Sequence, residues 1–339
     1  MESTQNLKKR IKSIANIKKI TKAMELVAAT KMRRSQEVAL ASRPYTFVAL
    51  DLLANLTLLE KSKNLQLPEL LRERKVYPVK SATQGAAASS KAGQFNRARK
   101  VLFVLVASDK GLAGSFNSSV FKKFEQHMER DKEKYRDEEK FYVAVGEKAF
   151  NYLSKKGINV LKKFTQAEDY TTPGQVEPIT KFIVEGYLNK SWDRVIIVSM
   201  HFRSALKQEP HVRKILPVDF DHIKETVQEI IPTTGKFAEL IKEHSMNFAA
   251  AENIREYLIE PSPKVVLEDL AKHLLFMQIY HLILEANAAE HSARRMAMKT
   301  ASDNASELGE DLSLQYNKSR QASITSQIIE IVSGAESLS

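Results

Sequence analysis

The sequence predicts an α/β fold joined to a long antiparallel coiled coil. In this fold the N- and C-terminal helices pair, and a central Rossmann-like, mainly parallel sheet domain separates them along the chain. Apolar residues recur at helical spacing near both ends, and the region between them alternates apolar strand-like runs with helical segments. We divide the chain into residues 1–67, 68–100, 101–218, 219–263 and 264–339.

Residues 1–67 are expected to form the N-terminal coiled-coil helix. Its apolar residues follow steps of three and four: Leu7, Ile11, Ile14, Ile17, Ile20, Met24 and Val27. Because several consecutive steps are three, the apolar stripe rotates around the helix and predicts contact with more than one surface. Pro44 predicts a kink. Between Met1 and Arg43 there are eleven basic and three acidic residues, which indicates either a solvated face or a helix gripped by acidic surroundings.

Residues 68–100 are predicted to be a basic insertion or linker. The stretch contains Pro68, Pro78 and Gly93, and residues 85–90 are a low-complexity run of glycine, alanine and serine. Long loops of this kind are usually functional or mobile. Two interpretations stay open, a solvated spacer and a regulatory segment that touches an acidic surface.

Residues 101–218 are predicted to be the α/β domain. The expected strands are Val101–Val106, Phe141–Val145, Ile158–Lys163, Arg194–Met200 and Val212–Pro217. The expected helices are one that follows a glycine loop and ends near Lys134, one over Glu147–Lys156 and one over Gln175–Lys190. Strands that alternate with helices predict a mainly parallel sheet covered on both faces. Residues 219–263 are expected to be an irregular connection with short helices.

Residues 264–339 are predicted to be one very long helix. An apolar seam runs through Leu267, Leu270, Leu274, Met277, Leu284 and Ala288. At about 1.5 Å per residue the helix would extend roughly 100 Å, which exceeds the diameter of a globular domain. Ten of the twenty-one residues 286–306 are alanine or serine, so a partner backbone can approach closely. The N-terminal helix is the expected partner.

Composition excludes several classes of site. The net charge of +11 favours an acidic partner, and the absence of cysteine excludes disulfides, thiolate catalysis and cysteine zinc sites. We expect no secretory signal, and no apolar run reaches the roughly eighteen residues that a membrane span needs. No histidine has the spacing of a metal ligand. We therefore predict no catalytic residue, no cofactor and no metal.

The glycine loop Ser108–Asn117 follows a strand and precedes a helix, which is where a doubly wound sheet binds phosphate. Its spacing matches neither GxGxxG nor GxxxxGK[ST]. We favour a tight structural turn over a nucleotide site.

Four blocks of sequence resemble a known family. They are residues 17–34, residues 293–305, the segment from Ile324 to Ser337, and the strand-loop Ser108–Leu112. In this order they resemble the gamma subunit of rotary (F-type) ATP synthases. The resemblance implies a non-catalytic central-stalk rotor that transmits torque between the membrane c-ring and the catalytic alpha/beta head. It thereby couples proton or sodium flow to ATP synthesis or hydrolysis.

The resemblance also implies partners and contact residues. The partners would be the alpha, beta and epsilon subunits and the c-ring, with the chain peripheral to the cytoplasmic face of a bacterial cell membrane. No nucleic acid and no small-molecule substrate is implied. The implied contacts with beta-subunit loops are Lys18, Lys22, Met24, Arg33, Arg34, Arg294, Gln321, Thr325 and Gln327. Gln327 stands where the family usually places glutamate, so a charge-assisted contact would become neutral.

Two other functions are compatible with parts of the sequence. A basic coiled coil that binds nucleic acid would explain the charge of the amino terminus and would show salt-dependent affinity. An α/β enzyme that uses residues 111–114 would bind a nucleotide on its own. Neither alternative accounts for the C-terminal block.

Overall fold

The computed structural model describes residues 3–41, 68–72, 74, 98–134, 138–165, 171–218 and 260–336. The chain divides into a helical unit, Met1–Thr30 with Arg294–Ser339, and an α/β unit, Lys31–Ala293. Helices α1 (Thr4–Ala41) and α8 (Pro263–Glu336) contribute to both. The predictions for residues 42–67, 75–97 and 219–259, including the Pro44 kink, lie outside the described residues.

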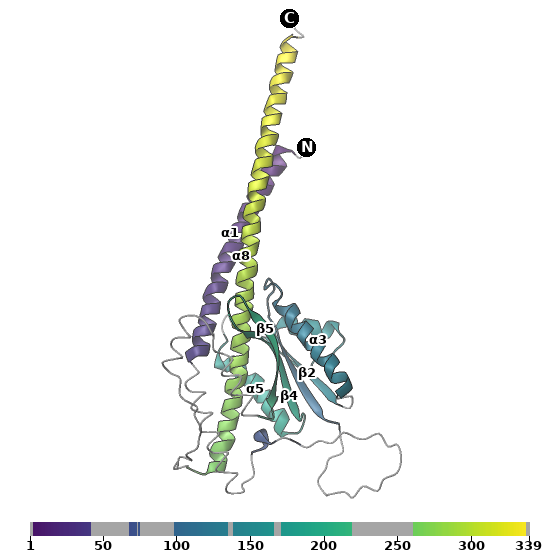
Figure 1. Cartoon of the computed structure of the whole chain (residues 1–339), viewed down its shortest axis with the longest axis vertical. Coiled ribbons are helices and arrows are strands. Elements are labelled where there is room, and N and C mark those ends of the chain that lie inside the picture. Colours follow the sequence, from purple (N-terminus) through teal and green to yellow (C-terminus); the bar gives the residue numbers. More distant parts are fainter. Residues whose placement is uncertain are drawn as a thin grey trace, which may run out of the picture. The chain divides into compact units, whose positions relative to one another are not determined.

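In the helical unit α1 and α8 pair and run in opposite directions (Figure 1). The buried residues of the pair are Leu7, Thr21, Glu25 and Ala28 on α1 and Met298, Ser302, Ala305 and Leu312 on α8. Successive members lie three, four or seven residues apart except for one step of fourteen, as in a coiled-coil seam. A Cβ built on Gly309 would lie 3.7 Å from Ile14 Cγ2. The predicted pairing of the terminal helices is confirmed.

The seam on α1 differs from the predicted apolar stripe. Ile17, Ile20 and Val27 are exposed, whereas the polar residues Thr21 and Glu25 are buried. A seam with α8 selects positions seven residues apart, and steps of three carry Ile17 and Ile20 away from it. Ile17, Ile20 and Val27 therefore point away from α8, which agrees with the prediction that the apolar stripe rotates around the helix.

The α/β unit is built on a five-stranded sheet with the order β3-β2-β1-β4-β5. The strands are β1 (Lys100–Val106), β2 (Glu139–Val145), β3 (Lys162–Phe164), β4 (Arg194–Phe202) and β5 (Gln208–Leu216). The first four strands in this order pair in parallel, with Phe103 opposite Tyr142 on one side and Ile196 on the other. β5 pairs antiparallel with β4. The predicted mainly parallel sheet is confirmed.

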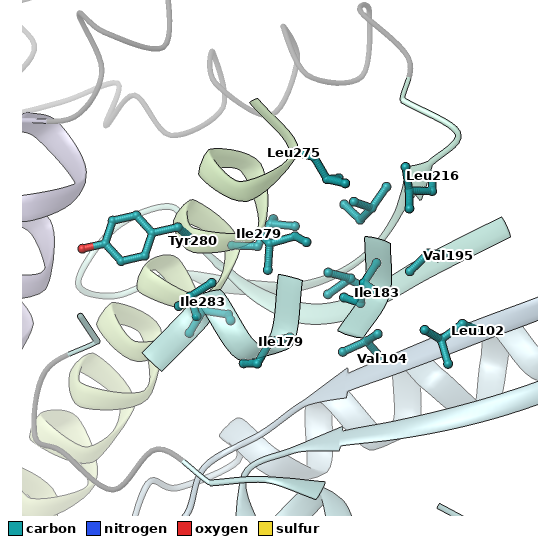
Figure 2. Packing of buried hydrophobic residues seen from close by; sticks show 14 of the residues in the cluster. Leu102, Val104, Ile179, Ile183, Val195, Leu216, Leu275, Ile279, Tyr280 and Ile283 are labelled. Atoms are coloured by element: carbon teal, nitrogen blue, oxygen red, sulfur yellow. The ribbon is translucent and has the colours of Figure 1, made fainter. Parts of the chain in front are cut away.

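Helices cover both faces of the sheet. Alternate residues of β1 enter different apolar clusters because successive side chains of a strand point to opposite faces. Val101, Phe103 and Leu105 pack with α3 (Phe116–Lys134) and α4 (Glu147–Lys155). Leu102 and Val104 pack with α5 (Pro173–Leu188) and with the first part of α8. Figure 2 shows Ile183 of α5 and Ile279 of α8 in this second cluster.

Three predicted boundaries are corrected by the structure. In place of the strand predicted at Ile158–Lys163, β3 is Lys162–Phe164. Ile158 and Val160 pack against an apolar cluster instead, and β3 pairs only with Val143–Val145 of β2. β5 begins four residues before the predicted Val212, since a tight hairpin at residues 203–207 starts the pairing at Phe202 and Gln208. Helix α5 begins at Pro173, ahead of the predicted Gln175.

The start of α5 has a clear physical cause. Thr172 N donates a hydrogen bond to Gln175 Oε1 at 3.3 Å, which satisfies a backbone donor ahead of the first turn. Proline is well tolerated as the first helical residue because its missing N–H would have had no helical partner there.

Candidate partner-binding surfaces

The C-terminal end of α8 is an exposed helix with large apolar side chains. All residues from 321 to 333 are exposed. The exposed apolar residues are Ile324, Ile328, Ile329, Ile331 and Val332, and Ile331 is 72% exposed. Ile324, Ile328 and Ile331 are separated by four and three residues and so lie on one helix face. Apolar side chains gathered on one face mark a surface that another molecule covers.

Three of the predicted contact residues lie in this exposed end. Gln321 and Thr325 are one helical turn apart, and Thr325 Oγ1 donates a hydrogen bond to the Gln321 carbonyl oxygen at 2.9 Å. Gln327 is six residues from Gln321 and faces another side of the helix. The structure thus brings Gln321 and Thr325 together and separates Gln327 from them.

A second surface lies on α1 in the same helical unit. Lys18 and Lys22 are exposed one turn apart, and Met24 is half-buried. Lys22 Nζ contacts Glu25 Oε2 at 2.9 Å, so part of its charge is compensated within the helix. The exposed Ile20 lies among these basic residues. This surface mixes cationic and apolar groups, as an acidic partner with apolar pockets would require.

Arg33 and Arg34 belong to the α/β unit. Both are exposed and both contact the Glu37 carboxylate, at 3.0 Å from Arg33 Nε and 3.8 Å from Arg34 Nη1. Arg294 opens the α8 segment of the helical unit and is partly buried. At about 1.5 Å per residue, Arg294 and Gln327 are separated by roughly 50 Å along α8. The nine predicted residues are therefore spread along two helices and do not form a single pocket.

The glycine loop is held by its own side chains. Ser108 N donates to Asn117 Oδ1 at 3.1 Å, and Glu147 N, at the start of α4, donates to Asp109 Oδ1 at 2.8 Å. Asp109 therefore caps the N-terminus of α4, and Asn117 in the first turn of α3 holds the start of the loop. Gly146 has a φ of 96°, and a Cβ there would lie 2.0 Å from the Ala107 carbonyl oxygen. These contacts favour the structural turn over a nucleotide site.

The described part of the chain contains no cluster of histidine and carboxylate side chains suited to a metal ion. None of its helices carries an apolar stretch sufficient for a membrane span.

A buried polar cluster, which the sequence analysis did not predict, joins α8 to the sheet. His201 Nδ1 of β4 lies 2.9 Å from Glu285 Oε2 of α8, and both side chains are 4% exposed. Arg213 Nη1 of β5 lies 3.5 Å from the same oxygen. The sequence signal for this contact was Glu285, a charged residue that stands in a largely apolar stretch of α8. This contact fixes α8 against β4 and β5.

Comparison with known proteins identifies the family. The family model described as ATP synthase matches residues 3–338. The ATP synthase gamma chain of Roseiflexus sp. (strain RS-1) is 32% identical over 338 residues and covers 100% of this chain and 99% of that relative. The ATP synthase gamma chain of Opitutus terrae is 34% identical over 331 residues, with 98% and 97% covered.

Two solved structures share the fold. One is from the mitochondrial ATP synthase of Euglena gracilis in rotational state 3, with a TM-score of 0.55 at 15% identity over 99% of this chain and 94% of that chain. The other is from the rotor of the same synthase in rotational state 1, with a TM-score of 0.51 at 15% identity. This match covers 95% of this chain and 98% of that chain. The family model over residues 3–338 and the relatives at 32% and 34% identity show that this chain belongs to the ATP synthase gamma chain family.

Proposed function

We propose that this chain is the central-stalk rotor subunit of a rotary ATP synthase. It transmits torque between a membrane c-ring and a catalytic alpha/beta head, and it couples proton or sodium flow to ATP synthesis or hydrolysis without breaking a bond itself. The family match over residues 3–338 supports this proposal. The alternative of a nucleic-acid-binding coiled coil finds no support in the comparisons, since the matched relatives are gamma chains.

The observation that carries the proposal is the difference between the two ends of α8. Leu267, Leu274 and Ile279 near its start are completely buried against the sheet domain, whereas every residue from 321 to 333 is exposed. Both stretches belong to one helix of 74 residues. A helix that is anchored at one end and presents apolar side chains at the other has the construction of a shaft. It can pass a turning force from its anchored domain to a partner that surrounds its tip.

We propose that Lys18, Lys22, Met24, Arg33, Arg34, Arg294, Gln321, Thr325 and Gln327 contact loops of the beta subunits. Their spread along α1 and α8 suits a shaft that meets several loops at different heights. Exposed ion pairs contribute about 0–1 kcal/mol each, so such contacts can break and re-form as the shaft turns. Gln327 offers a neutral contact at a position where a carboxylate would add a charge-assisted one.

The proposed partners are the alpha, beta and epsilon subunits and the c-ring. We place the chain at the cytoplasmic face of a bacterial cell membrane as a peripheral subunit. The bacterial relatives at 32% and 34% identity support this placement. The coupling ion is proposed to be a proton or a sodium ion.

Co-purification tests the assembly. The tagged chain is isolated from its native membranes, its partners are identified by mass spectrometry, and ATPase activity is assayed. Recovery of alpha, beta and epsilon subunits with ATPase activity is expected. Recovery of the chain alone, or with nucleic acid, would contradict the proposal.

Rotation can be observed directly because the chain contains no cysteine. Leu206, at the hairpin between β4 and β5, is 80% exposed, so Leu206→Cys provides a single thiol for attaching a bead. With the head immobilised, ATP should drive unidirectional rotation of the bead. A complex that hydrolyses ATP at the normal rate while the bead stays fixed would refute the rotor assignment. The complex that carries the unaltered, cysteine-free chain, treated with the same thiol reagent, is the control for attachment to other subunits.

A further inference from the structure

A cavity of about 330 Å³ lies between α3 and β5 in the α/β unit. Both elements are labelled in Figure 1. It is lined by Lys123, Gln126, His127 and Arg130 of α3 and by residues 210–212 of β5. We call this cavity the α3–β5 pocket. It lies outside every surface assigned to the proposed function.

The lining from α3 is basic because of its spacing. Lys123, Gln126, His127 and Arg130 occupy positions i, i+3, i+4 and i+7, which share one helix face. Glu125 and Glu129 are the α3 carboxylates whose side chains the structure describes, and neither lines the pocket. The Glu125 side chain accepts hydrogen bonds from Lys156 Nζ and from Tyr152 Oη, each at 2.7 Å. The hydrogen bond with Lys156 is the main reason that the pKa of Glu125 is lowered. This carboxylate is therefore neutralised away from the pocket.

The lining contains two cations, Lys123 and Arg130. Among the residues that the structure describes, neither Lys123 nor Arg130 forms an ion pair, and no carboxylate lines the pocket. One carboxylate contacts a lining residue, since Glu209 Oε2 lies 3.8 Å from His211 Nε2. Glu209 is itself held by Lys207 at 2.9 Å and by Arg203 at 3.3 Å. The lining of the pocket thus contains two cationic side chains and no carboxylate.

The size and the donors of the pocket define the ligand chemistry. Small-molecule sites typically enclose about 300–1,000 Å³, so the pocket has room for more than a single oxyanion. An arginine guanidinium matches phosphate oxygens with two parallel N–H groups, and a lysine ammonium adds a point charge. The amide of Gln126 supplies further N–H donors. Two or more linked phosphoryl groups, or one phosphoryl group with an organic substituent, fit these features.

We propose that the α3–β5 pocket binds a phosphate-bearing anion through Lys123 and Arg130. The anion is a soluble polyphosphate or nucleotide, or the phosphate headgroup of a lipid, and both present the same chemistry to the two cations. The two cations lie on consecutive turns of one helix and face a concave pocket. This arrangement suits a compact anion better than an extended acidic peptide.

Lysine footprinting of the assembled complex tests this site. The complex is treated briefly with an amine-acetylating reagent, with sodium pyrophosphate present or with sodium chloride at equal ionic strength, and acetylation is quantified by peptide mass spectrometry. Lys123 should be acetylated at least fivefold less in pyrophosphate. Lys122, its neighbour on α3 outside the lining, is the matched control and should change less than twofold. Equal protection of both lysines, protection by chloride alone, or no protection would overturn the proposal.

Variants and vesicles complete the test. Calorimetric titration of the purified full chain with pyrophosphate should give an affinity that Lys123→Gln with Arg130→Gln weakens at least tenfold, while Lys122→Gln leaves it unchanged. Phosphatidylglycerol vesicles that protect Lys123 when phosphatidylcholine vesicles do not would identify a lipid headgroup as the source. Protection by polyglutamate without protection by any phosphate probe would assign the pocket to an acidic peptide and refute the proposal.

Discussion

Replacing Glu285 with alanine should destabilise the α/β unit strongly. Glu285 Oε2 lies 2.9 Å from His201 Nδ1 and 3.5 Å from Arg213 Nη1 in a region where the His201 and Glu285 side chains are 4% exposed. The substitution removes the carboxylate from both contacts and leaves the Arg213 side chain, 10% exposed, without that counter-ion. Breaking a buried ion pair by removing one partner costs about 3–5 kcal/mol, and solvent screening is small at this burial. We expect a loss of about 3–5 kcal/mol in the free energy of unfolding.

The chain contains its own probe for this measurement. Trp192 is the only tryptophan and is buried in the cluster that joins the sheet, α5 and α8. Urea unfolding of the full chain, followed by Trp192 fluorescence, should show a midpoint lowered by at least about 1 M, because m is about 1–3 kcal/mol/M. Glu285→Gln keeps the shape and a hydrogen-bond acceptor and should lose less. Glu330→Ala, on the exposed end of α8, should change nothing. A loss below about 1 kcal/mol for Glu285→Ala would refute the reasoning.

Three further predictions follow from named contacts. Gly186→Ala should lower the free energy of unfolding by about 1–3 kcal/mol through overpacking, because the new Cβ would lie 1.9 Å from the Trp192 ring. Gly174→Ala is the control and should be tolerated, because a Cβ there has nothing within 4 Å. Urea unfolding measures both variants. Burial and, to a lesser extent, Glu125 raise the pKa of Tyr152 in the folded state. The stabilisation from this group is therefore complete at pH values below the unfolded-state tyrosine pKa of about 10, and it is lost as the pH rises above that value. Tyr152→Phe should flatten that fall in alkaline unfolding measurements, and an unchanged slope would contradict the assignment. The third prediction concerns the basic insertion 68–100. If this insertion contacts an acidic surface, deletion of residues 81–93 from it should alter the ATPase activity of the assembled complex or its inhibition, and unchanged activity and inhibition would identify it as a spacer.

Most of the fold was predictable because its signals are local. The apolar run Val101–Val106 and the uninterrupted helical pattern after Pro263 each specify an element without reference to the rest of the chain. The boundaries of β3 and β5 were less predictable because they depend on pairing partners. β3 ends where β2 offers no further partner, and β5 begins where the hairpin brings Gln208 opposite Phe202. These strand boundaries depend on tertiary pairing, so the periodicity of the sequence alone does not predict them.

The candidate surfaces were predictable only in part. The exposed end of α8 contains Gln321, Thr325 and Gln327, which were singled out through the family resemblance, and the exposed isoleucines around them are visible in the sequence. The α3–β5 pocket was not expected, because the helical spacing of Lys123, His127 and Arg130 does not reveal that residues 210–212 of β5 pack beside that face. The pair His201 and Glu285 was missed for the same reason, since 84 residues separate its members.

The buried polar contacts of α8 explain how its anchored end resists turning in place. Rotation of this end of α8 about its axis would expose buried side chains such as Leu274 and Ile279, so apolar packing already opposes it. Hydrogen bonds and ion pairs are more directional than apolar contacts and add to that resistance. Glu285 and Ser292 lie seven residues apart on one side of α8, and Asn287 lies about 200° away from Glu285. Glu285 contacts His201, Ser292 Oγ donates to the Ala205 carbonyl oxygen at 2.7 Å, and Asn287 Nδ2 donates to Thr171 Oγ1. Directional contacts on opposite sides fix the angular position of the helix, which a shaft that transmits torque requires. Burying these polar groups lowers the stability of the fold. They lie in the segment of α8 that is packed on the sheet domain, which is the segment that would receive the torque in the proposed function.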